Sequence, residues 1–205
     1  MPRFTKSELQ GFYGASVPDL LPEPDQPLRL LFVGINPGLW TAATQTHFAH
    51  PVNRFYPALL RAGIIDRPID AAAGMTPRDR DYFRARGIGI SNIVHRATAR
   101  ASELTDKELR SGGEDLLSLV KARKPAVVAI AGITAYRTAF GLPKAKLGRQ
   151  PLPLGATEAA LFGTASPADD SDLWVVPNPS GLNAHETVET LAEAYAAPAR
   201  AAGLL

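Results

Sequence analysis

Mostly apolar runs alternate with amphipathic stretches along this chain. The apolar runs lack the strict polar–apolar alternation of half-exposed strands, which favours strands buried on both faces. We expect such strands at residues 30–34, 87–94, 126–132 and 173–177. Helical spacing of apolar residues predicts helices at residues 53–63, 78–86, 105–124, 134–140 and 186–201. This alternation predicts an α/β fold, a three-layer sandwich with a mostly parallel central sheet and helices on both faces.

The helix at 105–124 has the clearest boundaries. Thr105 followed by Glu108 forms a capping-box pattern at its start, and Pro125 ends it. The pair Gly112-Gly113 weakens the prediction for its middle. Further strand pieces are expected at 151–154 and 158–162, followed by an exposed acidic loop at 163–172.

The chain is long enough for one domain with a real core, at 205 residues. Residues 1–28 are rich in proline and acidic side chains and predict an extended lead-in with a short helix at its start. We expect residues 29–205 to form a single domain. No internal repeat is visible.

Composition narrows the chemistry. Hydrophobic residues make up 45% and charged residues 20% of the chain, which is typical of a folded soluble protein. The net charge is +2 and the pI about 9.0, a basic balance compatible with a nucleic-acid partner. The absence of cysteine excludes disulfides, thiolate metal sites and a cysteine nucleophile.

Metal, cofactor and membrane binding are not expected. The nearest histidine pair, His47 and His50, lacks the carboxylates of a zinc motif. The N-terminal segment has no continuous apolar region, and no later run reaches membrane-spanning length. We therefore expect a cytoplasmic protein without a resident metal or cofactor.

Two loops of similar composition follow the first and last predicted strands. They read GINPG at 34–38 and PNPSGLN at 177–183. Asn-Pro and glycine-rich steps are ordinary turn chemistry, so both loops can be simple turns. However, the carboxyl ends of parallel strands share one edge of a sheet, where ligands bind in open α/β folds. Neither loop fits a Walker or a Rossmann motif.

Taken together, the motifs resemble those of the mismatch-specific uracil-DNA glycosylases, relatives of thymine-DNA glycosylase. The resemblance covers the chain from about residue 29 to the last predicted helix. It is carried, in order, by GINPGLWTAATQTHFAHPVNRFY (34–56), IGISNIVHRAT (88–98), ELRSGGEDL (108–116) and VVPNPSGL (175–182).

The resemblance implies a monomeric, monofunctional DNA glycosylase that acts on double-stranded DNA. Such an enzyme flips uracil, especially from G·U mispairs, and hydrolyses the N-glycosidic bond, leaving an abasic site for base excision repair. Neither loop motif contains a lysine for a Schiff base, so water is the expected nucleophile. The alternatives are a non-catalytic DNA-damage-binding protein of the same fold and a small-molecule hydrolase or nucleotide-binding protein.

The first loop and its neighbours supply the implied base pocket. Asn36 matches the residue that positions the water, and Phe48 matches the aromatic side chain on which uracil stacks. Backbone groups around Ile35 and Phe48 would read the base edge, with the hydroxyl of Thr41 nearby. Asn92 matches an asparagine that approaches the base or the water.

The second loop supplies the implied DNA contacts. Leu182 would be the wedge that fills the gap left by the flipped nucleotide. Gly181 would face the partner base, and Ser180 would hold phosphates. Asn178 stands where the fastest uracil-DNA glycosylases carry a histidine, which predicts modest rates. Asn183 follows the wedge, where the family often has a serine.

Departures from the family pattern concern charged groups. The arginine that often follows the wedge is replaced within Asn183-Ala184-His185, which puts affinity and opposite-base preference in doubt. His185 would either replace part of it or cap the last helix. Thr98 is expected near the pocket, Asp81 is a minor candidate for a general base, and Arg54 is one of several candidate phosphate contacts.

Overall fold

A computed structural model describes residues 4–150 and 171–205 of the chain. The strand pieces predicted at 151–154 and 158–162, and most of the predicted acidic loop, lie outside the described residues.

The described residues contain a five-stranded sheet with the order β2-β1-β3-β5-β4. Its parallel strands are β1 (Leu30–Gly34), β2 (Ile88–Asn92), β3 (Val127–Ala131) and β5 (Asp172–Val176). The edge strand β4 (Gly148–Arg149) is antiparallel to β5. The sheet is thus mostly parallel, as predicted, and β4 is too short to produce a sequence signal.

Strand β1 lies between β2 and β3 and is buried on both faces. Leu30 and Phe32 belong to one apolar cluster, whereas Leu31 and Val33 belong to the other. All four side chains are fully buried. Successive side chains of a strand point to opposite faces, so this continuous apolar run fits a strand covered by helices on both sides.

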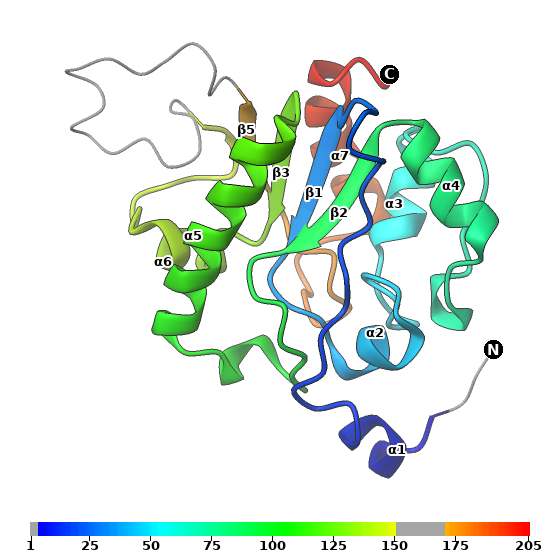
Figure 1. The fold of residues 1–205 in the computed structure, drawn as a ribbon, viewed down its shortest axis with the longest axis vertical. Coiled ribbons are helices and arrows are strands. Elements are labelled where there is room, and N and C mark those ends of the chain that lie inside the picture. Colours follow the sequence, from blue (N-terminus) through cyan, green and yellow to red (C-terminus); the bar gives the residue numbers. More distant parts are fainter. Residues whose placement is uncertain (1–3, 151–170) are drawn as a thin grey trace.

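The helices form two layers around the sheet (Figure 1). One face is covered by α3 (Phe55–Arg61), α4 (Pro77–Ala85) and α7 (Val188–Ala201). The opposite face is covered by α5 (Asp106–Arg123) and α6 (Ile133–Phe140). The three-layer α/β sandwich is therefore confirmed.

Helix α5 is continuous despite its two central glycines. The Thr105 side chain accepts a hydrogen bond from the backbone N–H of Glu108, and the Glu108 carboxylate accepts one from the backbone N–H of Thr105, as the capping box predicts. A β-carbon at Gly112 would collide with the carbonyl of Ile93. The glycine pair therefore permits close packing and does not interrupt the helix.

The N-terminal segment begins with the short helix α1 (Lys6–Gln10) and then runs extended along β2. Leu20 and Ile90 form an antiparallel bridge, with the two backbone hydrogen bonds at 2.9 and 2.7 Å. Val17 and Leu20 are buried. The lead-in therefore contributes side chains to the core, while the domain boundary at residue 28 stays a prediction.

The remaining elements are short and lie near the ends of the parallel strands. They are α2 (Leu39–Thr44) and the 3₁₀ helices η1 (Ala71–Ala73) and η2 (Ala101–Glu103). In the described part of the chain, no helix combines the length and the apolar character needed to cross a membrane.

Candidate functional site

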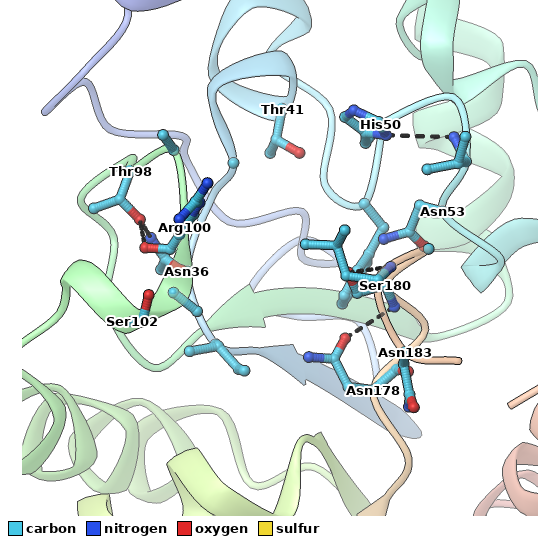
Figure 2. A pocket seen from close by; sticks show the side chains of 18 of the residues that line it. Asn36, Thr41, His50, Asn53, Thr98, Arg100, Ser102, Asn178, Ser180 and Asn183 are labelled. Atoms are coloured by element: carbon cyan, nitrogen blue, oxygen red, sulfur yellow. Dashed lines mark hydrogen bonds between the residues drawn. The ribbon is translucent and has the colours of Figure 1, made fainter. Parts of the chain in front are cut away.

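A pocket of about 640 Å³ lies at the carboxyl edge of the parallel strands, among the loops that follow β1, β2 and β5 (Figure 2). It brings the two predicted loops together. All of the site residues proposed from the sequence line it: Ile35, Asn36, Thr41, Phe48, Asn92, Asn178, Ser180, Gly181, Leu182 and Asn183. Their individual roles remain predictions.

The pocket is rich in amide side chains. Every asparagine of the chain lines it, namely Asn36, Asn53, Asn92, Asn178 and Asn183. An uncharged amide offers both donors and an acceptor, so this lining suits a planar ligand with both kinds of group on its edge.

The amide of Asn36 is held in one orientation. Its Nδ2 donates to the carbonyl oxygens of Arg96 and Pro37, at 3.0 and 3.2 Å, and to Thr98 Oγ1 at 2.7 Å. The Thr98 hydroxyl in turn donates to the carbonyl of Arg100. Rotating the amide by 180° would place its oxygen against carbonyl oxygens. Within the described residues, Asn36 Oδ1 accepts no hydrogen bond and is free to bind water.

The ring of Phe48 forms part of the pocket wall. One face stacks on Phe55, with centroids 4.1 Å apart and an interplanar angle of 24°. Phe48 also adopts a left-handed backbone conformation with φ of 55°, which is uncommon for a bulky residue. Because Phe55 is fully buried, it fixes one face of the Phe48 ring and leaves the other side for a ligand.

Asn92 ends β2 beside Gly34, the last residue of β1. Its Nδ2 lies 3.0 Å from Nδ1 of the buried His47, whose Nε2 lies 3.0 Å from the carbonyl oxygen of Pro18. Burial lowers the pKa of His47 below its ordinary value, so the ring is neutral at pH 7.

The second loop is folded by its own polar side chains. Asn178 Oδ1 accepts from the N–H of Ser180 at 3.0 Å, and the Asn178 carbonyl accepts from Asn183 Nδ2 at 3.0 Å. The N–H of Leu182 donates to Ser180 Oγ at 3.3 Å. These bonds turn Leu182 outward, where its side chain is 89% exposed at the pocket rim.

The structure gives Arg54 a role that differs from the predicted phosphate contact. Its guanidinium donates to the carbonyls of Asn183 at 3.0 Å and Glu186 at 2.7 Å, with a longer bond to Gly181 at 3.4 Å. Its backbone N–H donates to the carbonyl of Pro179 at 3.0 Å. Arg54 therefore fastens the second loop to the start of α3.

Gly181 lies directly against the segment before α3. A β-carbon at Gly181 would collide with the side chain and the carbonyl of Val52. Val52 is itself 58% exposed and, like Leu182, lines the pocket. Two exposed apolar side chains thus flank the pocket opening.

The sequence interpretation did not identify several other lining residues. Asn53 accepts a hydrogen bond from the N–H of Phe55 and so fixes the start of α3. Arg100 and Ser102 reach the pocket from the segment of η2, and His50 lies across from them (Figure 2). Arg100 and Ser102 belong to no recognisable motif. They arrive because the N–H of Thr98 donates to the carbonyl of Pro37 and joins the two segments.

Carboxylates are absent from the pocket lining formed by the described residues. Asp79 completes the capping box of α4 and pairs with Arg67, and Asp81 pairs with Arg84 on the same helix. His185 is not the cap of α7, because Thr187 fills that position. Among residues 4–150 and 171–205, no group of three or more histidine, aspartate or glutamate side chains is arranged to hold a metal.

A mostly parallel sheet with an amide-lined pocket at the carboxyl ends of its parallel strands is the architecture of a ligand-binding α/β protein. The family model of the uracil DNA glycosylase superfamily matches residues 22–198. The chain belongs to this superfamily. Membership makes it a DNA-binding hydrolase of the DNA glycosylase class, concerned with uracil in DNA repair.

Proposed function

We propose that the chain is a monofunctional, mismatch-specific uracil-DNA glycosylase. It flips uracil out of duplex DNA, with preference for G·U mispairs, and hydrolyses the N-glycosidic bond to leave an abasic site for base excision repair. Membership of the superfamily supports the general activity. The mismatch preference and the residue roles below form the proposal, together with action as a monomer.

In the proposed complex, the flipped uracil stacks on the free face of Phe48. The stack of Phe48 on Phe55 supports this arrangement, since it leaves one aromatic face for the base. Stacking of a base on an aromatic side chain contributes about 1–3 kcal/mol and tolerates differences in base identity. Hydrogen bonds from the surrounding amides then distinguish one base from another.

The reaction proceeds by departure of the base and attack of water. The C1′–N1 bond breaks, its electron pair leaves with uracil as an anion, and the sugar becomes oxocarbenium-like. A water then bonds to C1′ and gives up a proton to solvent. The anchored amide of Asn36 supports the positioning role, because its free Oδ1 can accept a hydrogen bond from that water. An amide cannot remove the proton, which favours modest rates.

Asn178 is proposed to stabilise the departing uracil anion. Its Oδ1 is occupied by the N–H of Ser180, so its Nδ2 is the group left to face the pocket (Figure 2). A neutral amide donor stabilises a developing negative charge less strongly than a charged donor would. This difference is a second reason to expect modest rates.

Leu182 is proposed to enter the duplex as the wedge. Its exposure at the rim supports this role, as does the fastening of its loop by Arg54. Insertion of an apolar side chain compensates for the stacking lost when the nucleotide leaves the helix. Ser180, Gly181 and Asn183 then contact the DNA around the wedge.

The observation that carries this proposal is the anchored amide of Asn36 in a carboxylate-free pocket of a uracil DNA glycosylase superfamily member. The test is release of base from labelled duplexes that contain a single G·U, A·U or G·T pair, and from a uracil-containing single strand. We expect uracil release that is fastest from G·U, with abasic sites that break only on alkali treatment. Equal release from G·U and A·U would contradict the mismatch preference. Tight binding without release would instead indicate a DNA-damage-binding protein.

A further inference from the structure

The contact between His47 and Asn92 suggests a positioning role for a residue outside the predicted site. His47 has a single set of partners that fixes its tautomer. The carbonyl of Pro18 can only accept, so His47 Nε2 carries the proton. Because the ring is buried and neutral, Nδ1 has no proton and acts as an acceptor. Asn92 must therefore present Nδ2, and not Oδ1, to His47 at 3.0 Å.

The backbone around this pair leaves little freedom. The hydroxyl of Tyr56 donates to the His47 carbonyl at 2.9 Å. Beyond the end of β2, the N–H of Ile93 donates to the carbonyl of Gly34 at 2.9 Å. Both partners are thus held at fixed positions, and the hydrogen bond between them sets the rotation of the Asn92 amide.

The other end of the amide lies beside the stacking ring. A β-carbon at Gly34 would stand 2.5 Å from Asn92 Oδ1 and 3.1 Å from Cζ of Phe48. The carbonyl oxygen and the ring therefore approach the same point above Gly34. In the described part of the chain, no group donates to Asn92 Oδ1, and this oxygen is not among the fully buried unpaired atoms. It is an acceptor that faces the pocket.

An acceptor at this place distinguishes pyrimidines by their ring nitrogen. Uracil carries an N–H at N3, whereas cytosine in the same pose presents a bare lone pair. If the amide were free to rotate, it could match either base by exchanging its oxygen for its NH₂ group. We propose that His47 is a positioning residue that locks Asn92 with its oxygen toward the base, so that the pocket accepts uracil and rejects cytosine.

This inference rests on the proposed function and concerns its selectivity. Cytosine opposite guanine is the normal content of DNA, so an enzyme directed at G·U must exclude it. Thymine has the same N3–H as uracil. The lock therefore does not exclude thymine, and any discrimination against it must come from the space around the C5 methyl group.

Two variants of His47 test whether this residue fixes the orientation of the Asn92 amide. In His47→Gln, the glutamine amide lies where Nε2 was, so it can donate to the carbonyl of Pro18. No acceptor then remains opposite Asn92 Nδ2. The amide of His47→Asn reaches the place of Nδ1, where its oxygen can accept from Asn92, but it gives up the bond to Pro18. Single-turnover release of uracil from G·U and of cytosine from G·C is measured for both, with thermal melting as a check on folding.

We expect His47→Gln to lose about tenfold or more in uracil release, to gain cytosine release, or both. His47→Asn should release more uracil and less cytosine than His47→Gln. Unchanged uracil release and no cytosine release in folded His47→Gln would overturn the lock. Absence of uracil release from every duplex in the wild-type protein would instead refute the proposed function.

A measurement on the unaltered protein covers the case in which His47→Gln does not fold. The ¹⁵N–¹⁵N coupling across the hydrogen bond between Asn92 Nδ2 and His47 Nδ1 can be measured directly by NMR. We expect a resolved coupling, with the His47 proton on Nε2. A proton on Nδ1 would overturn the inference, because Asn92 would then have to turn its oxygen toward His47.

Discussion

The ring of Phe48 lies nearly parallel to the ring of Phe55, 4.1 Å away, so that a fully buried core residue supports a side chain of the pocket wall. The two rings therefore have separable roles. Phe48→Leu should reduce uracil release by about tenfold or more through lost base stacking, with a smaller loss of stability than Phe55→Ala causes. Phe55→Ala should lower the free energy of unfolding by about 3–5 kcal/mol. Urea unfolding and single-turnover kinetics on both variants check this division. Unimpaired uracil release by Phe48→Leu would remove Phe48 from the base site.

The exposure of Leu182 allows its function to be tested without disturbing the fold. Leu182→Ala should change stability by less than about 0.5 kcal/mol, because the side chain is 89% exposed. Uracil release from duplex DNA should fall by about tenfold, and release from a single strand should fall less, since no base has to leave a stack. Leu205→Ala, at a 47% exposed leucine near the C-terminus, serves as the matched control. Equal losses on duplex and single strand would argue against a wedge.

The internal bonds of Arg54 predict an unusual response to salt. Glutamine carries no charge and cannot reproduce the planar donor set that contacts the carbonyls of Asn183 and Glu186. Arg54→Gln should therefore lower the free energy of unfolding by about 1–3 kcal/mol and weaken binding to duplex DNA. The slope of log affinity against log salt concentration should stay unchanged. A slope that becomes shallower by about 0.9 would show that Arg54 contacts a phosphate after all.

Burial of His47 predicts that this side chain destabilises the protein in acid. Its pKa is lowered below the ordinary value of 6.5, mainly by desolvation. As the pH falls below that value, the unfolded chain binds a proton that the folded protein does not, so stability contributed by neutral His47 is lost. The groups that face it electrostatically are Asp19, His95 and Arg80. Among them, His95 has a raised pKa because it bonds to Asp19, and it acts in the opposite direction.

Urea unfolding between about pH 7.5 and pH 5.5 separates these contributions. The stability of the wild-type protein relative to His47→Asn should decrease as the pH falls through this range. A difference that does not depend on pH would mean that His47 is not kept neutral by burial.

The fold was predictable from sequence because its determining signals are local. Continuous apolar runs indicated the buried parallel strands, and Thr105 with Glu108 marked the start of α5. Strand β4 and helix α2 gave no such signal: the first has two residues, and the second follows an N-cap glycine, Gly38, which has no side chain to cap it. The glycine pair weakened the prediction for the middle of α5, although α5 is continuous there. A glycine is required at Gly112 because the helix lies directly against the carbonyl of Ile93.

Two signals predicted the site: the sequence motifs, and the common edge at which the carboxyl ends of parallel strands lie. Asn36 and Leu182 lie in motifs, and the sheet places their loops together. The role of His47 depends on Pro18, which comes from the lead-in, and no pattern along the chain connects these residues. Arg54 was only one of several candidate phosphate contacts, because a sequence shows its charge but not the carbonyls around it.

The central claim is that the anchored amide of Asn36 positions the attacking water, and single-turnover release of uracil from a G·U duplex by Asn36→Ala tests it most directly. Gln10→Ala, which removes an exposed amide outside the pocket lining, is the control. We predict that Asn36→Ala binds the duplex like the wild-type protein but releases uracil about 100-fold more slowly or worse, whereas Gln10→Ala behaves as wild type. Uracil release by Asn36→Ala at the wild-type rate would contradict the account.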